Sequence, residues 1–233
     1  MLFLRSLLYF LASTLVLIVL VLAAFLILPA SLKTKYALLS QWSKFCLWAL
    51  RVFCNIKLEV KGQENIPDKP CVIISNHQST WETLGFQQVF PQQSWVLKKE
   101  LLWIPIFGWG LALLKPIVID RGEKLRALKK VISQGLDRLK QGIYVIIFPE
   151  GTRQAYGQLG EYQNGGVAIA KKSGELILPV YHNAGKVWPK GSFTKHPGTI
   201  TVVIGEPIAP GKTSAAELTQ QVRNWTQTQA QQY

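Results

Sequence analysis

Apolar residues dominate the first part of the chain. Within residues 6–28 the only polar residues are Ser6, Ser13 and Thr14. A helix of this length extends about 35 Å, enough to cross a hydrocarbon core of about 30 Å. The run is longer than the roughly 7 to 15 residues of a signal-peptide core, and Pro29-Ala30-Ser31 is a poor cleavage site. The pattern therefore predicts a retained membrane helix, which either spans the membrane or re-enters it.

A second helical pattern follows and is amphipathic. Its apolar positions recur at helical spacing: Leu38, Leu39, Trp42, Phe45, Cys46, Ala49, Leu50 and Phe53. The other face carries Gln41, Lys44 and Arg51. Tryptophans and flanking cations are typical of a helix in the membrane interface, and packing on the rest of the chain would produce the same pattern. We expect residues 1–55 to form a membrane-anchoring helical segment, with the remaining chain on the cytoplasmic face because cations follow the first helix.

Short apolar runs alternate with amphipathic stretches from residue 56 onwards. Strands are predicted at residues 56–61, 71–75, 95–97, 117–119, 143–148, 176–180 and 199–204. A helix is predicted between residues 119 and 143, ending at Gly142, and a final helix begins at the capping box of residues 214–217. This alternation predicts an α/β fold for residues 56–233, with a mainly parallel sheet flanked by helices.

Two polar clusters directly follow predicted strands. Residues 76–82 read Asn-His-Gln-Ser-Thr-Trp-Glu, and residues 148–153 read Phe-Pro-Glu-Gly-Thr-Arg. Polar residues beyond the carboxyl ends of parallel strands form ligand sites, so the clusters meet if the two strands are neighbours. The first offers an imidazole with a carboxylate, which suits a general base, and the second a carboxylate and a guanidinium on a tight turn, which suits an anionic group. Since neither has a cysteine, a Gly-x-Ser-x-Gly motif or metal-ligand spacing, we expect the substrate to bring the nucleophile, a hydroxyl being the obvious candidate.

The spacing of His77 and Glu82 restricts how they can pair. On a continuous helix, side chains five residues apart point about 140° apart, so His77 has to lie in the loop before the helix. Residues 79–82 read Ser-x-x-Glu, which is typical of a helix start. The same pattern has a second interpretation, in which Glu82 only caps that helix.

These residues resemble the signatures of the glycerolipid acyltransferases. His77 with an acid at the fifth position after it is similar to their His-x4-Asp motif, although this chain has Glu82 where the family usually has Asp. Residues 148–153 match a second signature. Residues 98–101 with Pro105, Gly108 and residues 119–121 match another block, and residues 178–180 a fourth. The resemblance covers roughly residues 57 to 210 and is greatest to the bacterial 1-acyl-sn-glycerol-3-phosphate acyltransferases.

The resemblance implies a reaction and a role for each site residue. His77, with its tautomer set by Glu82, would remove the proton from the sn-2 hydroxyl of lysophosphatidic acid as that oxygen attacks a thioester of acyl-CoA or acyl carrier protein. Arg153 would hold the phosphate. The implied remaining binding residues are Glu150, which orders the turn, Gly151, which lets the backbone approach closely, Thr152, and the cations Lys98 and Arg121. No metal or cofactor is implied.

Two alternatives to this reaction remain at the level of the sequence. The same chemistry could act on another acceptor, such as a lyso-aminolipid or glycerol 3-phosphate. A non-catalytic membrane protein that binds anionic lipids could also keep the fold, and the intact His77, Glu82 and Arg153 count against it.

The net charge and the remaining reactive residues limit the possible partners and the cellular compartment. A net charge of +13 and a pI of about 9.8 favour an acidic partner. Membrane lipids are favoured over nucleic acid, because no zinc-finger, helix-turn-helix or RNA-binding signature is present. Cys46, Cys54 and Cys71 lie in apolar runs and are expected to be buried thiols in a reducing compartment. His182 and His196 are expected to be structural.

Overall fold

The predicted strands form one mainly parallel sheet. The structure is a computed structural model that describes residues 1–119 and 124–233. Within these residues seven strands pair in the order β1-β7-β6-β2-β5-β3-β4. The strands are β1 (Ile56–Lys61), β2 (Val72–Ser75), β3 (Gln93–Lys98), β4 (Ile117–Ile119), β5 (Tyr144–Ile147), β6 (Ile177–His182) and β7 (Gly198–Ile204). Only β6 and β7 pair antiparallel among them. The predicted α/β class is confirmed.

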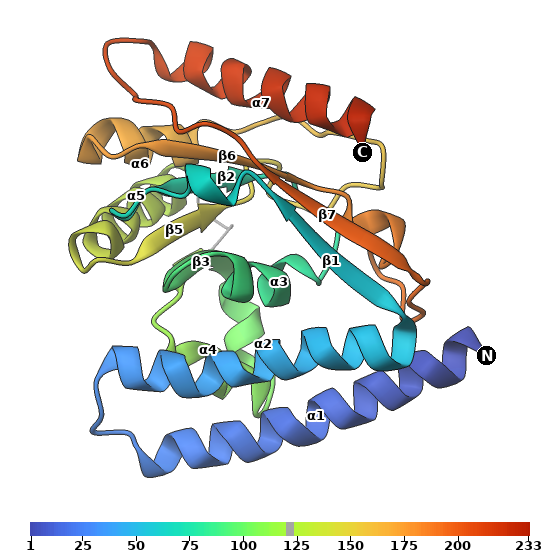
Figure 1. Cartoon of the computed structure of the whole chain (residues 1–233). Helices are drawn as coiled ribbons and strands as arrows, with labels where there is room; N and C mark the ends of the chain where they lie inside the picture. The colour runs from blue at the N-terminus through green and yellow to red at the C-terminus, as the bar shows by residue number, and fades with distance from the viewer. Residues whose placement is uncertain (120–123) are drawn as a thin grey trace.

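Helices cover both faces of this sheet (Figure 1). On one side lie α1 (Leu2–Leu26), α2 (Leu32–Cys54), α3 (Glu82–Val89) and α4 (Phe107–Leu113). On the other lie α5 (Lys124–Lys140), α6 (Gly165–Ser173) and α7 (Ala215–Gln232). Short 3₁₀ helices occur at η1 (Gln63–Asn65), η2 (Lys99–Trp103) and η3 (Ala184–Lys186). The two helices predicted after residue 119 and at the capping box are α5 and α7, and the box forms with Ser214 and Glu217.

The central strands are buried on both faces, as their uninterrupted apolar runs predict. Successive side chains of a strand point to opposite faces. Ile73 and Ile146 therefore join the core under α2 and α3, while Val72 and Val145 join the core under α5, α6 and α7. Each such side chain contributes about 1.5 to 3 kcal/mol by leaving water. The two cores hold the carboxyl ends of β2 and β5 rigidly side by side.

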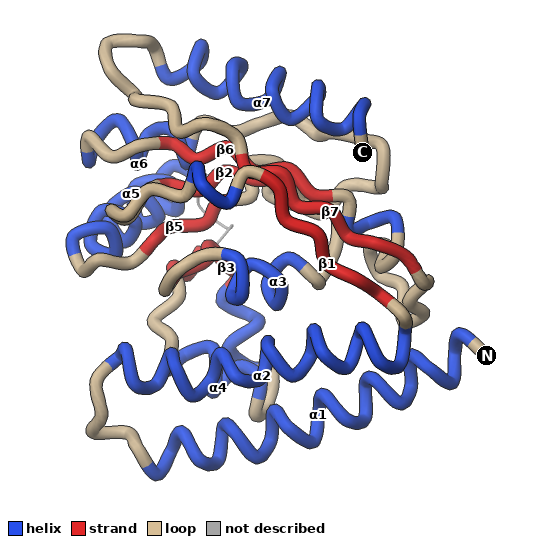
Figure 2. The backbone as a smooth tube through the Cα atoms, viewed as in Figure 1, coloured by secondary structure: helices blue, strands red, loops and turns tan. Residues whose placement is uncertain are grey.

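The two N-terminal helices form an antiparallel pair on the side of the sheet that α3 covers (Figure 2). The apolar face of α2 is buried against α1 and α3 through Leu39, Cys46 and Leu50, so the packing alternative for this helix is the one observed. The Trp42 indole N–H donates to the Ser13 carbonyl oxygen at 2.8 Å. The thiols of all three cysteines are free and buried, as expected.

α1 presents an apolar stripe away from α2. The exposed residues of this stripe recur every three or four positions: Leu4, Leu8, Leu11, Leu15, Val19, Leu22 and Leu26. By length and composition, α1 is able to cross a membrane. Soluble monomers rarely expose so large a contiguous apolar surface, and such a stripe is typical of a membrane-contacting helix.

Candidate active site

The two polar clusters meet at one edge of the sheet. β2 and β5 are neighbours in parallel register, with Ile74 opposite Ile147, so the residues that follow each strand lie together. Asn76 fixes this edge from the other side. Its amide nitrogen donates to the His182 carbonyl oxygen at 2.9 Å, and its amide oxygen accepts the His182 N–H at 3.0 Å. The side chain of Asn76 thus continues the pairing of β2 with β6 beyond the end of the strand.

His77 lies in the loop between β2 and α3, where its pairing with Glu82 requires it. Its Nδ1 hydrogen-bonds Oε2 of Glu82. The imidazole stacks on the ring of Phe148, with centroids 4.3 Å apart and planes 14° from parallel. Its side chain is 17% exposed. Because Nδ1 is engaged by the carboxylate, Nε2 is the nitrogen left to exchange a proton with a substrate.

Glu82 is completely buried and uses both carboxylate oxygens. While Oε2 binds His77, Oε1 accepts the backbone N–H groups of Gln78, at 2.6 Å, and Ser79. Burial by itself would raise the pKa of Glu82, but the neighbouring histidines and these N–H donors outweigh burial and lower that pKa. Glu82 therefore orients His77 and also binds the backbone at the start of the helix.

The helix itself starts later than the sequence suggests. α3 begins at Glu82 rather than just after Ser79. The Ser79 hydroxyl accepts the N–H of Trp81 at 3.2 Å and therefore does not act as the N-cap of the helix. The Glu82 carboxylate supplies the acceptor for the Ser79 N–H instead.

Glu150 links the turn after β5 to the loop that carries His77 by hydrogen bonds. Its Oε2 accepts the backbone N–H of His77 at 2.7 Å, and its Oε1 accepts that of Gly160 at 3.0 Å. In return, the N–H of Gln154 donates to the His77 carbonyl oxygen at 2.7 Å. Burial raises the pKa of Glu150 to about 7, against the opposing effect of the two N–H donors. Gly151 closes the turn with φ +65°, which favours glycine.

The remaining predicted binding residues that the structure describes lie on the turn and the strand end around this edge. Arg153 is half-buried and Thr152 is exposed on the turn that Glu150 holds. Lys98 is exposed at the end of β3, the strand next to β5. Arg121 lies outside the described residues. The structure thus joins His77, Glu82 and Glu150 by hydrogen bonds and places the two described cations on adjacent strand ends.

His182 is buried and hydrogen-bonded, in line with the structural role expected of it, and it also lies beside Glu82, a contact that sequence reasoning missed. It ends β6, its ring is fully buried, and its Nε2 lies 3.2 Å from Oε1 of Glu82. Burial lowers the pKa of His182 and outweighs the raising effect of Glu82, which favours the neutral form of the ring. The signal that could have found it is its position at a strand end, but that signal requires knowing that β6 lies beside β2.

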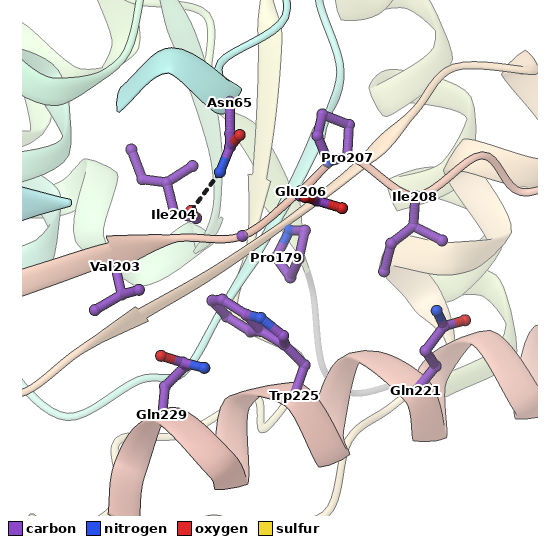
Figure 3. A pocket seen from close by; sticks show the side chains of 11 residues that line it. Asn65, Pro179, Val203, Ile204, Glu206, Pro207, Ile208, Gln221, Trp225 and Gln229 are labelled. Atoms are coloured by element: carbon purple, nitrogen blue, oxygen red, sulfur yellow. Dashed lines mark hydrogen bonds between the residues drawn. The ribbon is translucent and has the colours of Figure 1, made fainter. Parts of the chain in front are cut away.

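A pocket of about 690 Å³ lies between α7 and the ends of β6 and β7, away from these residues (Figure 3). Trp225, Pro179 and Glu206 line it, and none of the predicted site residues does. Among the described residues, no group of three or more His, Cys, Asp or Glu side chains is arranged to hold a metal ion.

Comparison with known proteins identifies the family of this chain. Residues 57–183, more than half of the chain, match the Acyltransferase family, and the chain belongs to it. The resemblance of the motifs is thereby confirmed.

Individual relatives carry more specific names. A 1-acyl-sn-glycerol-3-phosphate acyltransferase of Pseudomonas aeruginosa is 49% identical over 202 residues, which cover 85% of this chain and 78% of that protein. The chloroplastic 1-acyl-sn-glycerol-3-phosphate acyltransferase BAT2 of Brassica napus is 31% identical, over 71% of this chain and 49% of that protein. The crystal structure of the 1-acyl-sn-glycerophosphate acyltransferase PlsC from Thermotoga maritima matches with a TM-score of 0.81 at 26% identity, covering 98% of this chain and 94% of that one.

Proposed function

We propose that this chain transfers a fatty acyl group from a thioester to the sn-2 hydroxyl of 1-acyl-sn-glycerol 3-phosphate, giving phosphatidic acid. The observation that carries the proposal is the His77–Glu82 pair, hydrogen-bonded through Glu150 to the turn that bears Arg153. Relatives named for this reaction share the sequence along most of the chain.

The proposed mechanism has two proton transfers. Nε2 of His77 takes the proton of the sn-2 hydroxyl as that oxygen attacks the thioester carbonyl carbon. The bond from that carbon to sulfur then breaks, and the departing thiolate receives the proton back from the imidazolium. Glu82 holds Nδ1–H throughout and stabilises the positive charge of the imidazolium. Backbone N–H groups beside the two clusters would stabilise the oxyanion of the tetrahedral intermediate.

Cations at the same edge supply the site for the acceptor's phosphate. The guanidinium of Arg153 suits a bidentate grip on phosphate oxygens, and Lys98 adds positive charge from the neighbouring strand. Thr152 and Arg121 belong to the same proposed site. Gly151 permits a close approach of the backbone. The donor is acyl-CoA or acyl carrier protein, and the net charge of +13 suits either acidic partner.

The N-terminal pair of helices supports attachment to a membrane on its cytoplasmic face. α1 contacts the rest of the chain near both ends: the Ser6 hydroxyl accepts the N–H of Lys195 at 2.9 Å, and the ring of Phe25 meets that of Trp109 at 6.3 Å. A helix held at both ends favours lying in the membrane interface over crossing the bilayer alone. The apolar stripe of α1 would enter the lipid, and residues 1–55 would act as the anchor.

A thiol-release assay with purified full-length protein tests the function. We expect thiol release from acyl-CoA or acyl carrier protein that depends on lysophosphatidic acid, with lyso-aminolipid and glycerol 3-phosphate as competing acceptors. His77→Ala should lower turnover about 10² to 10⁴-fold, the typical contribution of a positioned general base, while remaining folded. His196→Ala is the matched control, because His196 is exposed and away from the site.

Two results would contradict the proposal. Absence of acceptor-dependent thiol release by the wild-type protein would favour the non-catalytic lipid-binding alternative. Near-normal turnover of folded His77→Ala would remove the mechanism.

A further inference from the structure

His182 is bound on three sides inside the core beneath the active site. Its Nε2 lies 2.9 Å from the carbonyl oxygen of Asn76 and 3.2 Å from Oε1 of Glu82. Its Nδ1 accepts the backbone N–H of Ala184 at 3.2 Å. The rings of Trp81 and Phe86 lie around it, with centroids at 6.2 and 5.7 Å. In the described part of the chain, Glu82 is the only acidic side chain within ion-pair distance of this ring.

These contacts define the tautomer of His182. Since Nδ1 accepts a hydrogen bond from Ala184, the ring proton is on Nε2. That proton is donated to the Asn76 carbonyl oxygen, and Oε1 of Glu82 lies 3.2 Å from the same nitrogen. The Nε2–H group of His182 therefore lies beside the carboxylate that holds the base, and the ring cannot itself reach a substrate because it is fully buried.

The two groups that donate hydrogen bonds to Oε1 belong to a different kind of element. Gln78 and Ser79 donate backbone N–H groups, and both belong to the same loop as His77. His182 belongs to β6, which pairs with β2 along four residues and is buried throughout. Among these three neighbours of Oε1, only His182 belongs to the sheet rather than to the loop that the carboxylate has to orient.

We propose that His182 is a positioning residue, whose Nε2–H group keeps the Glu82 carboxylate in place against His77. A glutamate side chain has several rotatable bonds and loses conformational freedom when it is fixed. With two backbone N–H groups bonded to Oε1 and the Nε2–H group of His182 beside it, Oε2 is left facing Nδ1 of His77. This inference rests on the acyl-transfer chemistry proposed above and does not depend on which acceptor is used.

Three substitutions separate the donor from the ring. His182→Phe keeps the aromatic volume and loses the N–H. His182→Gln loses the ring but carries an amide N–H to about the reach of Nε2, and His182→Asn carries the amide one carbon short of it. We expect His182→Phe and His182→Asn to lower kcat about 10- to 100-fold, the size expected for losing the interaction of an N–H group with a charged group, with both KM values within about 2-fold of wild type. His182→Gln should retain most of the activity.

A packing role predicts the opposite order, with His182→Phe active and His182→Gln impaired, and that order would overturn the proposal. Melting temperatures identify any variant that fails to fold. If His182→Phe does not fold, the comparison of His182→Gln with His182→Asn decides, because equal losses of kcat in those two would overturn the donor role.

A double-mutant cycle tests whether His182 acts through Glu82. In a Glu82→Gln background, adding His182→Phe should cost less than about 2-fold more, and effects that simply multiply would overturn the proposal. Every variant is compared with the wild type on the acceptor that the wild type uses. A wrong acceptor assignment would therefore show in the wild-type panel and leave the comparison between variants intact.

Discussion

Glu82→Gln replaces one carboxylate oxygen of a buried side chain by an NH₂ group, so a hydrogen-bond acceptor becomes a donor at that atom. The amide oxygen can still accept the N–H groups of Gln78 and Ser79, which Oε1 accepts now. The amide NH₂ then takes the place of Oε2 and faces Nδ1 of His77. Two donors cannot pair, so the imidazole would move its proton to Nε2 and accept at Nδ1. In that tautomer Nε2 cannot take the proton of a hydroxyl.

The expected loss follows from this change of tautomer. Replacing the corresponding carboxylate of Ser-His-Asp triads by its amide lowers kcat about 10⁴-fold by the same cause. We expect Glu82→Gln to lower kcat about 10³ to 10⁴-fold here. Because one hydrogen bond to a charged group is lost and two are kept, stability should fall by about 1 to 3 kcal/mol. For a chain of this size that is a decrease of about 2 to 12 °C in melting temperature.

The assay is acceptor-dependent thiol release measured beside melting temperature. Glu82→Asp should keep part of the activity, about 1 to 10% of wild-type kcat, because the negative charge remains while the carboxylate withdraws by one methylene. Glu217→Gln is the matched control, since Glu217 is the capping-box residue of α7, far along the chain and exposed. It should be close to neutral in both measurements, as glutamine caps nearly as well as glutamate.

A fully active Glu82→Gln enzyme would refute the reasoning. It would mean that Oε2 has no role in the tautomer of His77 and that the carboxylate serves only the backbone of residues 78 and 79. An inactive variant with an unchanged melting temperature would support orientation of the base alone.

Two further predictions concern binding and the anchor. Arg153→Ala should raise the KM for the phosphorylated acceptor about 10- to 100-fold with little change in kcat. Arg153→Lys should restore only part of the affinity, because a point charge cannot reproduce a bidentate grip. Initial rates measured against each substrate check this, and a loss confined to the donor's KM would contradict it. Deleting residues 1–30 should release the protein from lipid vesicles or leave it aggregated, since the deletion removes the apolar stripe and uncovers α2. Flotation with vesicles measures this, and a full-length chain that is soluble and monomeric without detergent would contradict the membrane assignment.

Contacts between residues that lie close together in the sequence, and the places of strand ends, could be predicted from the sequence. The strands β2 and β5 are apolar runs that end at a polar cluster, so both their burial and the place of His77 and Glu150 could be predicted. The pairing of His77 with Glu82 could also be predicted, since only a loop position brings side chains five apart together.

Contacts that depend on the order of the strands in the sheet could not be predicted from the sequence. Nothing in a run of apolar residues says which strand will be its neighbour, and β6 reaches β2 across more than 100 residues of chain. The contact of His182 with Glu82 follows from that order and could not be predicted. The two interpretations of Glu82 were posed as alternatives because a sequence does not show that each carboxylate oxygen has a separate partner.

The amphipathic pattern of α2 was ambiguous for a related reason. A helix buries the same apolar face against lipid or against protein, and the period of 3.6 residues is the same in both cases. The contacts with α1 and α3 resolve it for α2, and the stripe of α1 remains as the surface without a protein neighbour among the described residues.

The spacing between the proposed phosphate site and the base depends on backbone bonds more than on flexible side chains. The N–H of His77 donates to Glu150, and the carbonyl oxygen of His77 accepts the N–H of Gln154, so Arg153 lies on a turn whose two sides are both bonded to the residue that carries the base. Gly151 holds that turn in a left-handed conformation that other residues adopt only with strain. A lysophospholipid gripped by its phosphate would therefore present its hydroxyl to Nε2 at a distance determined by the fold. A rigid separation of this kind lowers the entropy cost of bringing the hydroxyl to the base, and it also disfavours acceptors whose hydroxyl lies at another distance from the phosphate.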